Sequence, residues 1–198
     1  MLTSIEKSRF FVSEQYIQAS KNLIDRMLPN GNPLVLISND EVSEHELIEG
    51  LRNSSQNIIL PALFCLYQGV ELLLKGFVNV KSKKKNGHEA EKLYNQFLTL
   101  FEEEKELVDL FNKFIYKPKT FIKQYMETNQ LNSINILYNS LRYSELKGGR
   151  QVDYYKLMYP NNDEFLSELF DLVHDIDQLL QWSIKLFRKL DLPSDTVK

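Results

Sequence analysis

The stretch IILPALFCLYQGVELLLKGFVNV, from Ile58 to Val80, decides the fold of this chain. Successive residues of a helix are about 100° apart, so its polar residues Gln68, Glu71 and Lys75 fall within roughly 60° of one another. We call these three residues the polar row. An unpaired buried charge costs several kcal/mol, so the row must meet partner groups or water. It therefore predicts either an internal polar network or the wall of a cleft.

The same stretch is long enough to span a bilayer. However, Glu71 and Lys75 near its middle each oppose membrane insertion by about 2.5 to 3.5 kcal/mol. The segment from Met1 to Phe11 lacks the apolar centre of a signal peptide. The single cysteine, Cys65, leaves no partner for an intrachain disulfide or a cysteine-based zinc site. We therefore expect a core helix in a cytoplasmic protein with no membrane partner.

Length and composition indicate a single folded domain over residues 1–198. Apolar residues make up 43% of the chain and aromatic residues 12%, with only 7 glycines and 6 prolines, which is typical of a helix-rich protein. The net charge of -3 argues against a broadly basic nucleic-acid surface. One local lysine cluster could touch phosphate, although such clusters are more often solvated loop tips: Lys81, Lys83, Lys84 and Lys85.

Capping signals divide the first half of the chain. Thr3 and Glu6 have capping-box spacing and predict a first helix that ends near Leu28. Residues 29–54 are expected to be an insertion with a short extended piece and a weak helix. The long second helix then runs over about 55–80. The apolar row expected on the first helix comprises Val12, Tyr16, Ala19, Leu23 and Met27.

The second half of the chain predicts further helices over 88–101, 105–116, 120–126 and 134–142. Ser133 caps the last of these. Residues 144–162 are expected to form a long irregular loop. Residues 163–190 predict a C-terminal bundle helix with heptad-like spacing. Its expected apolar row comprises Leu166, Leu169, Val173, Ile176, Leu180, Phe187 and Leu190, with Ser183 in the one polar slot.

Two positions are candidates for chemistry. His88 follows Gly87 at a predicted helix start, where it could act as a general base, contact RNA phosphate, or simply cap the helix. Arg142 and Tyr143 close the 134–142 helix. A cation at a helix C-terminus is favourable by itself, and the guanidinium could also point at phosphate or at Glu71.

Other common sites have little support in the sequence. His45 and His174 lie among acidic residues and are expected to be solvated. The three histidines are far apart and show no metal-ligand spacing, so we expect no metal and no cofactor. No Walker loop, GxGxxG or GxSxG occurs, which argues against phosphate-cradling and nucleophile-elbow enzymes.

The motifs of the chain, taken together, resemble the prokaryotic HEPN superfamily. The resemblance covers roughly residues 55–149. In that superfamily, a long helix carries Gln, Glu and Lys, the next helix begins with Gly-His, and an Arg-Tyr pair follows later. These motifs are Leu66-Tyr67-Gln68, Glu71-Leu72-Leu73-Leu74-Lys75-Gly76, Gly87-His88 followed by Leu93, and Leu141-Arg142-Tyr143.

The resemblance implies an all-α fold: an up-and-down bundle of four to five long helices with short extra helices and an insertion after the first. It also implies a homodimer and a setting in toxin-antitoxin or anti-phage systems, with RNA, a nucleotide, an antitoxin or a defence protein as candidate partners. Many members are metal-independent ribonucleases with an Arg-x4-6-His motif. No arginine here has a histidine in that window, and Ser144 stands where many relatives have proline.

Three functions follow as hypotheses. The first is a HEPN-like binding or regulatory module whose polar row and Tyr143 organise the core or line a cleft. The second is a divergent ribonuclease in which His88 is the base or acid and Arg142 or Lys75 stabilises charge on phosphate, within one chain or across a dimer. The third is a helical scaffold without a ligand.

Overall fold

The computed structural model describes residues 2–32, 43–82, 87, 89–143, 145–146 and 148–192. These residues form an all-α helical bundle, which confirms the predicted fold class. The predicted extended piece after the first helix lies outside the described residues. So do His88, Ser144 and the three loop lysines from Lys83 to Lys85.

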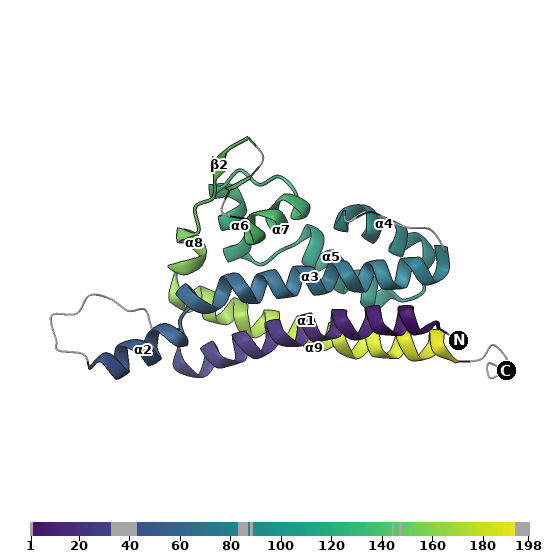
Figure 1. Cartoon of the computed structure of the whole chain (residues 1–198), viewed down its shortest axis with the longest axis horizontal. Helices are drawn as coiled ribbons and strands as arrows, with labels where there is room; N and C mark the ends of the chain where they lie inside the picture. Colours follow the sequence, from purple (N-terminus) through teal and green to yellow (C-terminus); the bar gives the residue numbers. More distant parts are fainter. Residues whose placement is uncertain are drawn as a thin grey trace.

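Three long helices lie side by side as the base of the bundle (Figure 1). They are α1 (Ser4–Met27), α3 (Ser55–Ser82) and α9 (Asn162–Asp191). The Phe10 ring near the start of α1 lies 5.9 Å from Phe77 near the end of α3 and 4.2 Å from Phe187 near the end of α9. Helix α1 is therefore antiparallel to both of its long neighbours.

The shorter elements lie on the side of α3 away from α1, except for η1, which continues α1, and α2, which projects from one end of the bundle (Figure 1). A short 3-10 turn, η1, ends the first helix. These elements are η1 (Leu28–Asn30), α2 (Glu44–Arg52), α4 (Ala90–Leu100), α5 (Lys105–Tyr116), α6 (Thr120–Thr128), α7 (Ile134–Arg142), β1 (Glu145–Leu146), β2 (Arg150–Gln151) and α8 (Tyr155–Met158).

Local capping fixes several helix ends as the sequence predicted. The Glu6 amide donates to Thr3 Oγ1 at 3.3 Å, and the Thr3 amide donates to Glu6 Oε2 at 2.7 Å, which completes the capping box. The Ile136 amide donates to Ser133 Oγ at 3.3 Å at the start of α7.

The predicted apolar row of α1 is wrong at most positions. The buried residues of α1 are Ser13, Ile17, Ser20, Ile24 and Met27, of which only Met27 was predicted, and Val12 is 41% exposed. The reason is close contact with α3. A Cβ atom on Gly69 would lie 2.5 Å from Ile17 Cγ1 and 3.0 Å from the backbone oxygen of Ser13. The glycine allows this approach, and the small Ser13 is buried beside Ile17 where hydrophobicity alone predicts no buried residue.

The predicted row of α9 is correct at Leu169, Ile176 and Ser183, which are buried. The rest of the fully buried row lies one position earlier than expected, while the residues predicted there are partly buried. Helix α9 contacts both α1 and α5, and two neighbours require a wider apolar face than a single heptad row. The earlier row comprises Phe165, Leu172, Leu179 and Leu186.

The 144–162 connection contains short regular elements within its predicted irregular path. Strands β1 and β2 pair antiparallel, with Leu146 opposite Arg150. Gly148 and Gly149 form the turn between them at φ 88° and 79°, a left-handed conformation that glycine adopts without steric cost.

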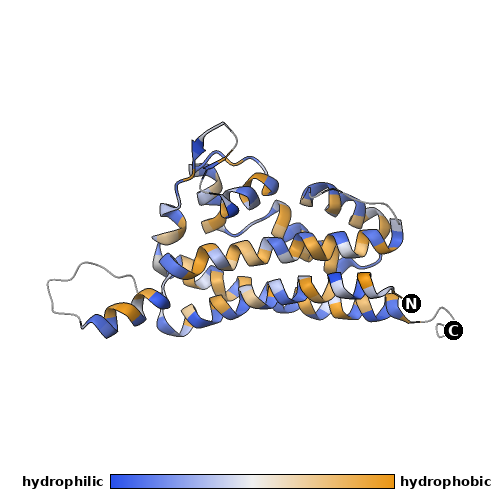
Figure 2. Ribbon diagram, viewed as in Figure 1, coloured by the Kyte–Doolittle hydropathy of each residue, from blue (hydrophilic) through white to orange (hydrophobic). Residues whose placement is uncertain are grey.

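Within the described residues, one helical stretch, Glu44–Ser82, is long and apolar enough to span a membrane. Figure 2 shows hydrophobic residues along nearly all of α3. In its most apolar window, 61% of the residues are buried inside the bundle. Length and composition alone are weak evidence for a span, because a buried core helix passes the same test.

Candidate functional site

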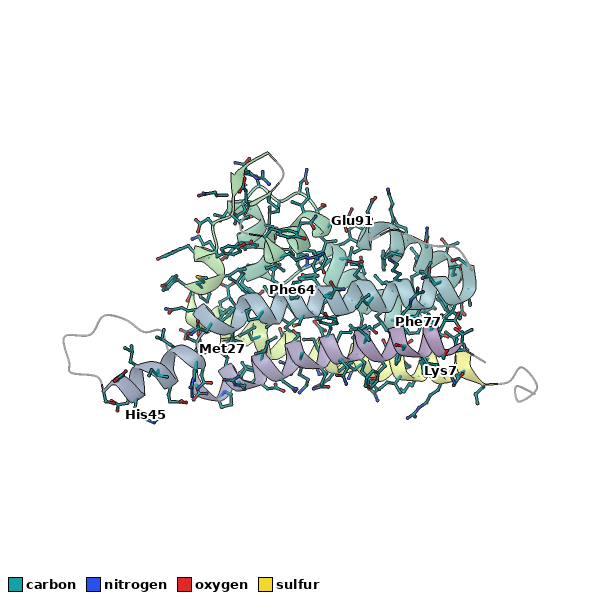
Figure 3. The ribbon with its side chains drawn as sticks, in the orientation of Figure 1. Lys7, Met27, His45, Phe64, Phe77 and Glu91 are labelled. Carbon is teal, nitrogen blue, oxygen red and sulfur yellow. The ribbon has the colours of Figure 1, made fainter. Side chains whose placement is uncertain are left out.

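The polar row lies on the side of α3 that faces α7. Phe64 is one turn before Gln68 on the same side, and its ring stacks on Tyr138 of α7 with centroids 6.0 Å apart. Figure 3 shows Phe64 on the side of α3 that carries the shorter helices. Glu71 is only 4% exposed, and Gln68 and Lys75 are half-buried. The polar row therefore lies at the junction between α3 and α7.

Tyr138 connects this row electrostatically with Arg142. Its hydroxyl group is buried and has no hydrogen-bond partner among the described residues. Burial raises the pKa of Tyr138 to about 12, the negative charge of Glu71 adds to that rise, and the positive charge of Arg142 opposes it. A buried carboxylate and an exposed guanidinium therefore act on the same phenol from two elements.

Arg142 contacts two aromatic rings at the C-terminus of α7. Its guanidinium carbon lies 5.3 Å from the ring centroid of Tyr138 and 5.3 Å from that of Tyr143. Cation-π attraction favours this position and leaves the N–H groups at the edge of the guanidinium for an anion. Arg142 is exposed to solvent. This geometry is compatible with both predicted roles of Arg142, which are to stabilise the C-terminus of α7 by its positive charge and to contact a phosphate.

Two cavities open beside this arginine. One of about 370 Å³ is lined by Phe64, Leu141, Arg142 and Tyr143. The other, also about 370 Å³, extends over the β1–β2 hairpin. Tyr143 is 54% exposed and lines both cavities. The residues of the second cavity are Ile136, Asn139, Tyr143, Glu145, Leu146 and Arg150.

We refer to Arg142, Tyr143 and Arg150 as the arginine-tyrosine surface. Sequence reasoning identified the first two residues and missed Arg150. The Gly148-Gly149 pair could have indicated Arg150, because two glycines predict a tight turn. That turn reverses the chain and places Arg150 opposite Leu146.

The start of α4 lies against the start of α7. The Ala90 amide donates to Asn135 Oδ1 at 2.8 Å, and the Ile134 amide donates to Glu91 Oε1 at 3.3 Å. Arg142 is at the opposite end of α7, roughly 10 Å farther along its axis at 1.5 Å per residue. His88 lies outside the described residues, so its predicted approach to Arg142 within one phosphate stays a prediction.

The other two histidines are exposed, as predicted for His45 and His174. His174, however, also lines a cavity between α5, α6 and α9 that the sequence did not suggest. In the part of the chain that the structure describes, no group of three or more His, Cys, Asp or Glu side chains could hold a metal ion.

Comparison of the chain with family models, with curated proteins and with solved structures found no match, so the resemblance to the HEPN superfamily stays a prediction that rests on the quoted residues.

Proposed function

We propose that this protein is a helical binding module whose arginine-tyrosine surface takes single-stranded RNA. The observation that carries the proposal is the contact of Arg142 with the rings of Tyr138 and Tyr143, where Tyr143 is exposed and lines two cavities. Unpaired bases stack on tyrosine faces, while arginine contacts phosphate or stacks on the next base. One exposed aromatic residue flanked by two arginines fits such a strand.

The local charge supports this proposal even though the whole chain has a net charge of -3. The charged residues that line the two cavities are two arginines, Arg142 and Arg150, and one carboxylate, Glu145. The surface is therefore locally positive in a protein that is overall negative. Such a patch attracts a polyanion at one place and not over the whole molecule.

The biological setting of this proposal comes from the HEPN resemblance. It implies a bacterial toxin-antitoxin or anti-phage system and a homodimer, while the cytoplasmic expectation comes from the single cysteine. The ribonuclease hypothesis depends on His88, and no observation on the described residues favours it over binding. Partners other than RNA, including an antitoxin or another defence protein, stay predictions that rest on the resemblance.

The test is fluorescence anisotropy with a labelled single-stranded RNA at two salt concentrations. We expect saturable binding that weakens with salt, and a loss of about tenfold in Arg142→Gln and in Tyr143→Ala. Arg9→Gln is the matched control, because Arg9 is an exposed arginine on α1. An equal loss in Arg9→Gln, or no saturable binding by the wild type, would contradict the proposal.

The ribonuclease alternative is tested with the same RNA in the presence of EDTA, which removes contaminating metal-dependent nucleases. Cleavage by the wild type and none by a folded His88→Ala, Arg142→Ala double variant would favour catalysis. Intact RNA, or equal cleavage by both proteins, would leave binding as the better description.

A further inference from the structure

A third cavity, of about 410 Å³, lies between α5, α6 and α9. It shares no residue with the two cavities of the arginine-tyrosine surface. Its apolar lining includes Phe114, Ile122 and Leu172, which are all nearly fully buried. Its size falls within the range of about 300 to 1,000 Å³ that is common for small-molecule sites.

Three lysines line this cavity, and two of them are held by one buried carboxylate. Lys113 Nζ lies 2.6 Å from Asp175 Oδ1, and Lys119 Nζ lies 2.9 Å from Asp175 Oδ2. Asp175 is only 4% exposed. Its carboxylate therefore fixes two ammonium groups at the edge of an apolar cavity, where their positions are defined before any ligand arrives.

Lys117 gives the cavity a surplus of positive charge. Asp171 and Asp175 supply two negative charges to the lining, against three positive charges from the lysines. In the described parts of the chain, Lys117 forms no ion pair, in contrast to Lys113 and Lys119. The lining thus carries a net charge of about one positive unit before His174 is counted.

Tyr67 supplies a buried hydroxyl group to the same cavity. It lines the cavity and is only 4% exposed. Burial raises the pKa of Tyr67, so its phenol is neutral and can donate a proton. Because the residue lines the cavity, this hydroxyl group is available as a donor to an anion there.

We propose that this cavity binds a small organic carboxylate with an apolar body. The single surplus charge matches a monoanion, and Lys117 is the lysine free to pair with it. The apolar lining takes the body of the ligand, and the Tyr67 hydroxyl group donates to the carboxylate. A phosphate dianion would exceed the surplus charge of the lining.

The test is calorimetric titration of the full chain with three probes: phenylacetate, cyclohexanecarboxylate and 4-methylpentanoate. We expect saturable binding of at least one probe at up to millimolar concentration. The matched amide of that probe should bind at least about tenfold more weakly, since it lacks the charge that Lys117 pairs with. Inorganic phosphate should not displace it.

The variants distinguish specific binding in the cavity from non-specific attraction of the carboxylate to surface lysines. Lys117→Gln should weaken the carboxylate by about tenfold, and Tyr67→Phe should weaken it by a smaller factor. Lys123→Gln is the matched control, because Lys123 is an exposed lysine of α6 that does not line the cavity. Binding of none of the three probes, equal binding of acid and amide, displacement by phosphate, or an equal loss in Lys123→Gln would each overturn the proposal.

Discussion

The two sides of α3 are built differently. Towards α1, the helices approach so closely that Gly69 lies against the backbone of Ser13 and Ile17, and Ser13 and Ser20 of α1 are completely buried. Towards α7, the same helix presents a buried carboxylate at Glu71, and the partner helix ends in an exposed arginine beside two cavities.

This difference indicates which side holds the fold together and which side is available for a ligand. Close packing of small residues maximises contact and leaves no room for a ligand. Each side buries a hydroxyl group without a partner among the described residues, that of Ser20 on α1 and that of Tyr138 on α7, so this feature does not distinguish them. The buried charge of Glu71 and the cavities beside α7 lie on one side only, which favours a functional reason for them. The predictions below test this division between a packing side and a ligand side.

The largest effect is expected for Gly69→Ala on the packing side. The added methyl group would overlap Ile17, and the displacement of α1 should destabilise the protein by about 2 kcal/mol. Urea unfolding followed by circular dichroism measures this change. Gly76→Ala is the control in the same helix, because no atom lies within 4 Å of its added Cβ. That variant should gain up to about 1 kcal/mol from helix propensity. An equal change in the free energy of unfolding of the two variants would show that close packing at Gly69 does not stabilise the fold.

The second effect is alkaline destabilisation through Tyr138 on the ligand side. Its pKa rises from 10.0 to about 12 in the folded state. The unfolded chain therefore loses this proton first, and the stabilising contribution of the protonated phenol falls as pH rises through this interval. The wild type should lose up to about 2 kcal/mol more than Tyr138→Phe over this range. Urea midpoints measured together with tyrosinate absorbance test the difference. Parallel loss in both proteins would show that Tyr138 titrates normally.

The third effect is the stability of Tyr138→Phe at neutral pH. This change removes a buried hydroxyl group that has no partner among the described residues, so we expect a gain of up to about 1 kcal/mol. The control is Tyr125→Phe, because the Tyr125 hydroxyl group donates to Ser140 Oγ at 3.0 Å and its removal should cost about 1 kcal/mol. A loss of stability in both variants would mean that the Tyr138 hydroxyl group has a stabilising partner.

The sequence predicted the fold class and most helix boundaries, because these depend on local signals. Thr3, Ser133 and the apolar run around Gly69 act within a few residues of themselves. The buried rows of α1 and α9 depend on which neighbours each helix meets. Hydrophobicity alone predicts that Val12 is buried and Ser13 is exposed. The structure shows the opposite, because Ser13 lies against Gly69 of α3.

The candidate site was predictable in part for the same reason. Arg142 and Tyr143 lie at a recognisable helix end, and the polar row is visible as an interruption of an apolar helix. The lysine cavity was not predictable. Lys113 and Lys119 meet Asp175 across more than fifty residues of sequence, and nothing local marks His174 or Tyr67 as members of the same site.

The smallest expected effect on stability is that of Arg142→Gln, and it is the sharpest test of the division. Arg142 is exposed, and an exposed cation-π contact contributes about 0.5 to 1 kcal/mol, so unfolding should change by no more than that. RNA binding, in contrast, should fall by about tenfold, since the phosphate contact is lost. Urea unfolding and anisotropy on the same preparation measure both quantities. A stability loss comparable with that of Gly69→Ala would show that Arg142 holds the bundle together. Both sides of α3 would then be packing sides, and the case for a ligand at α7 would rest on the cavities alone.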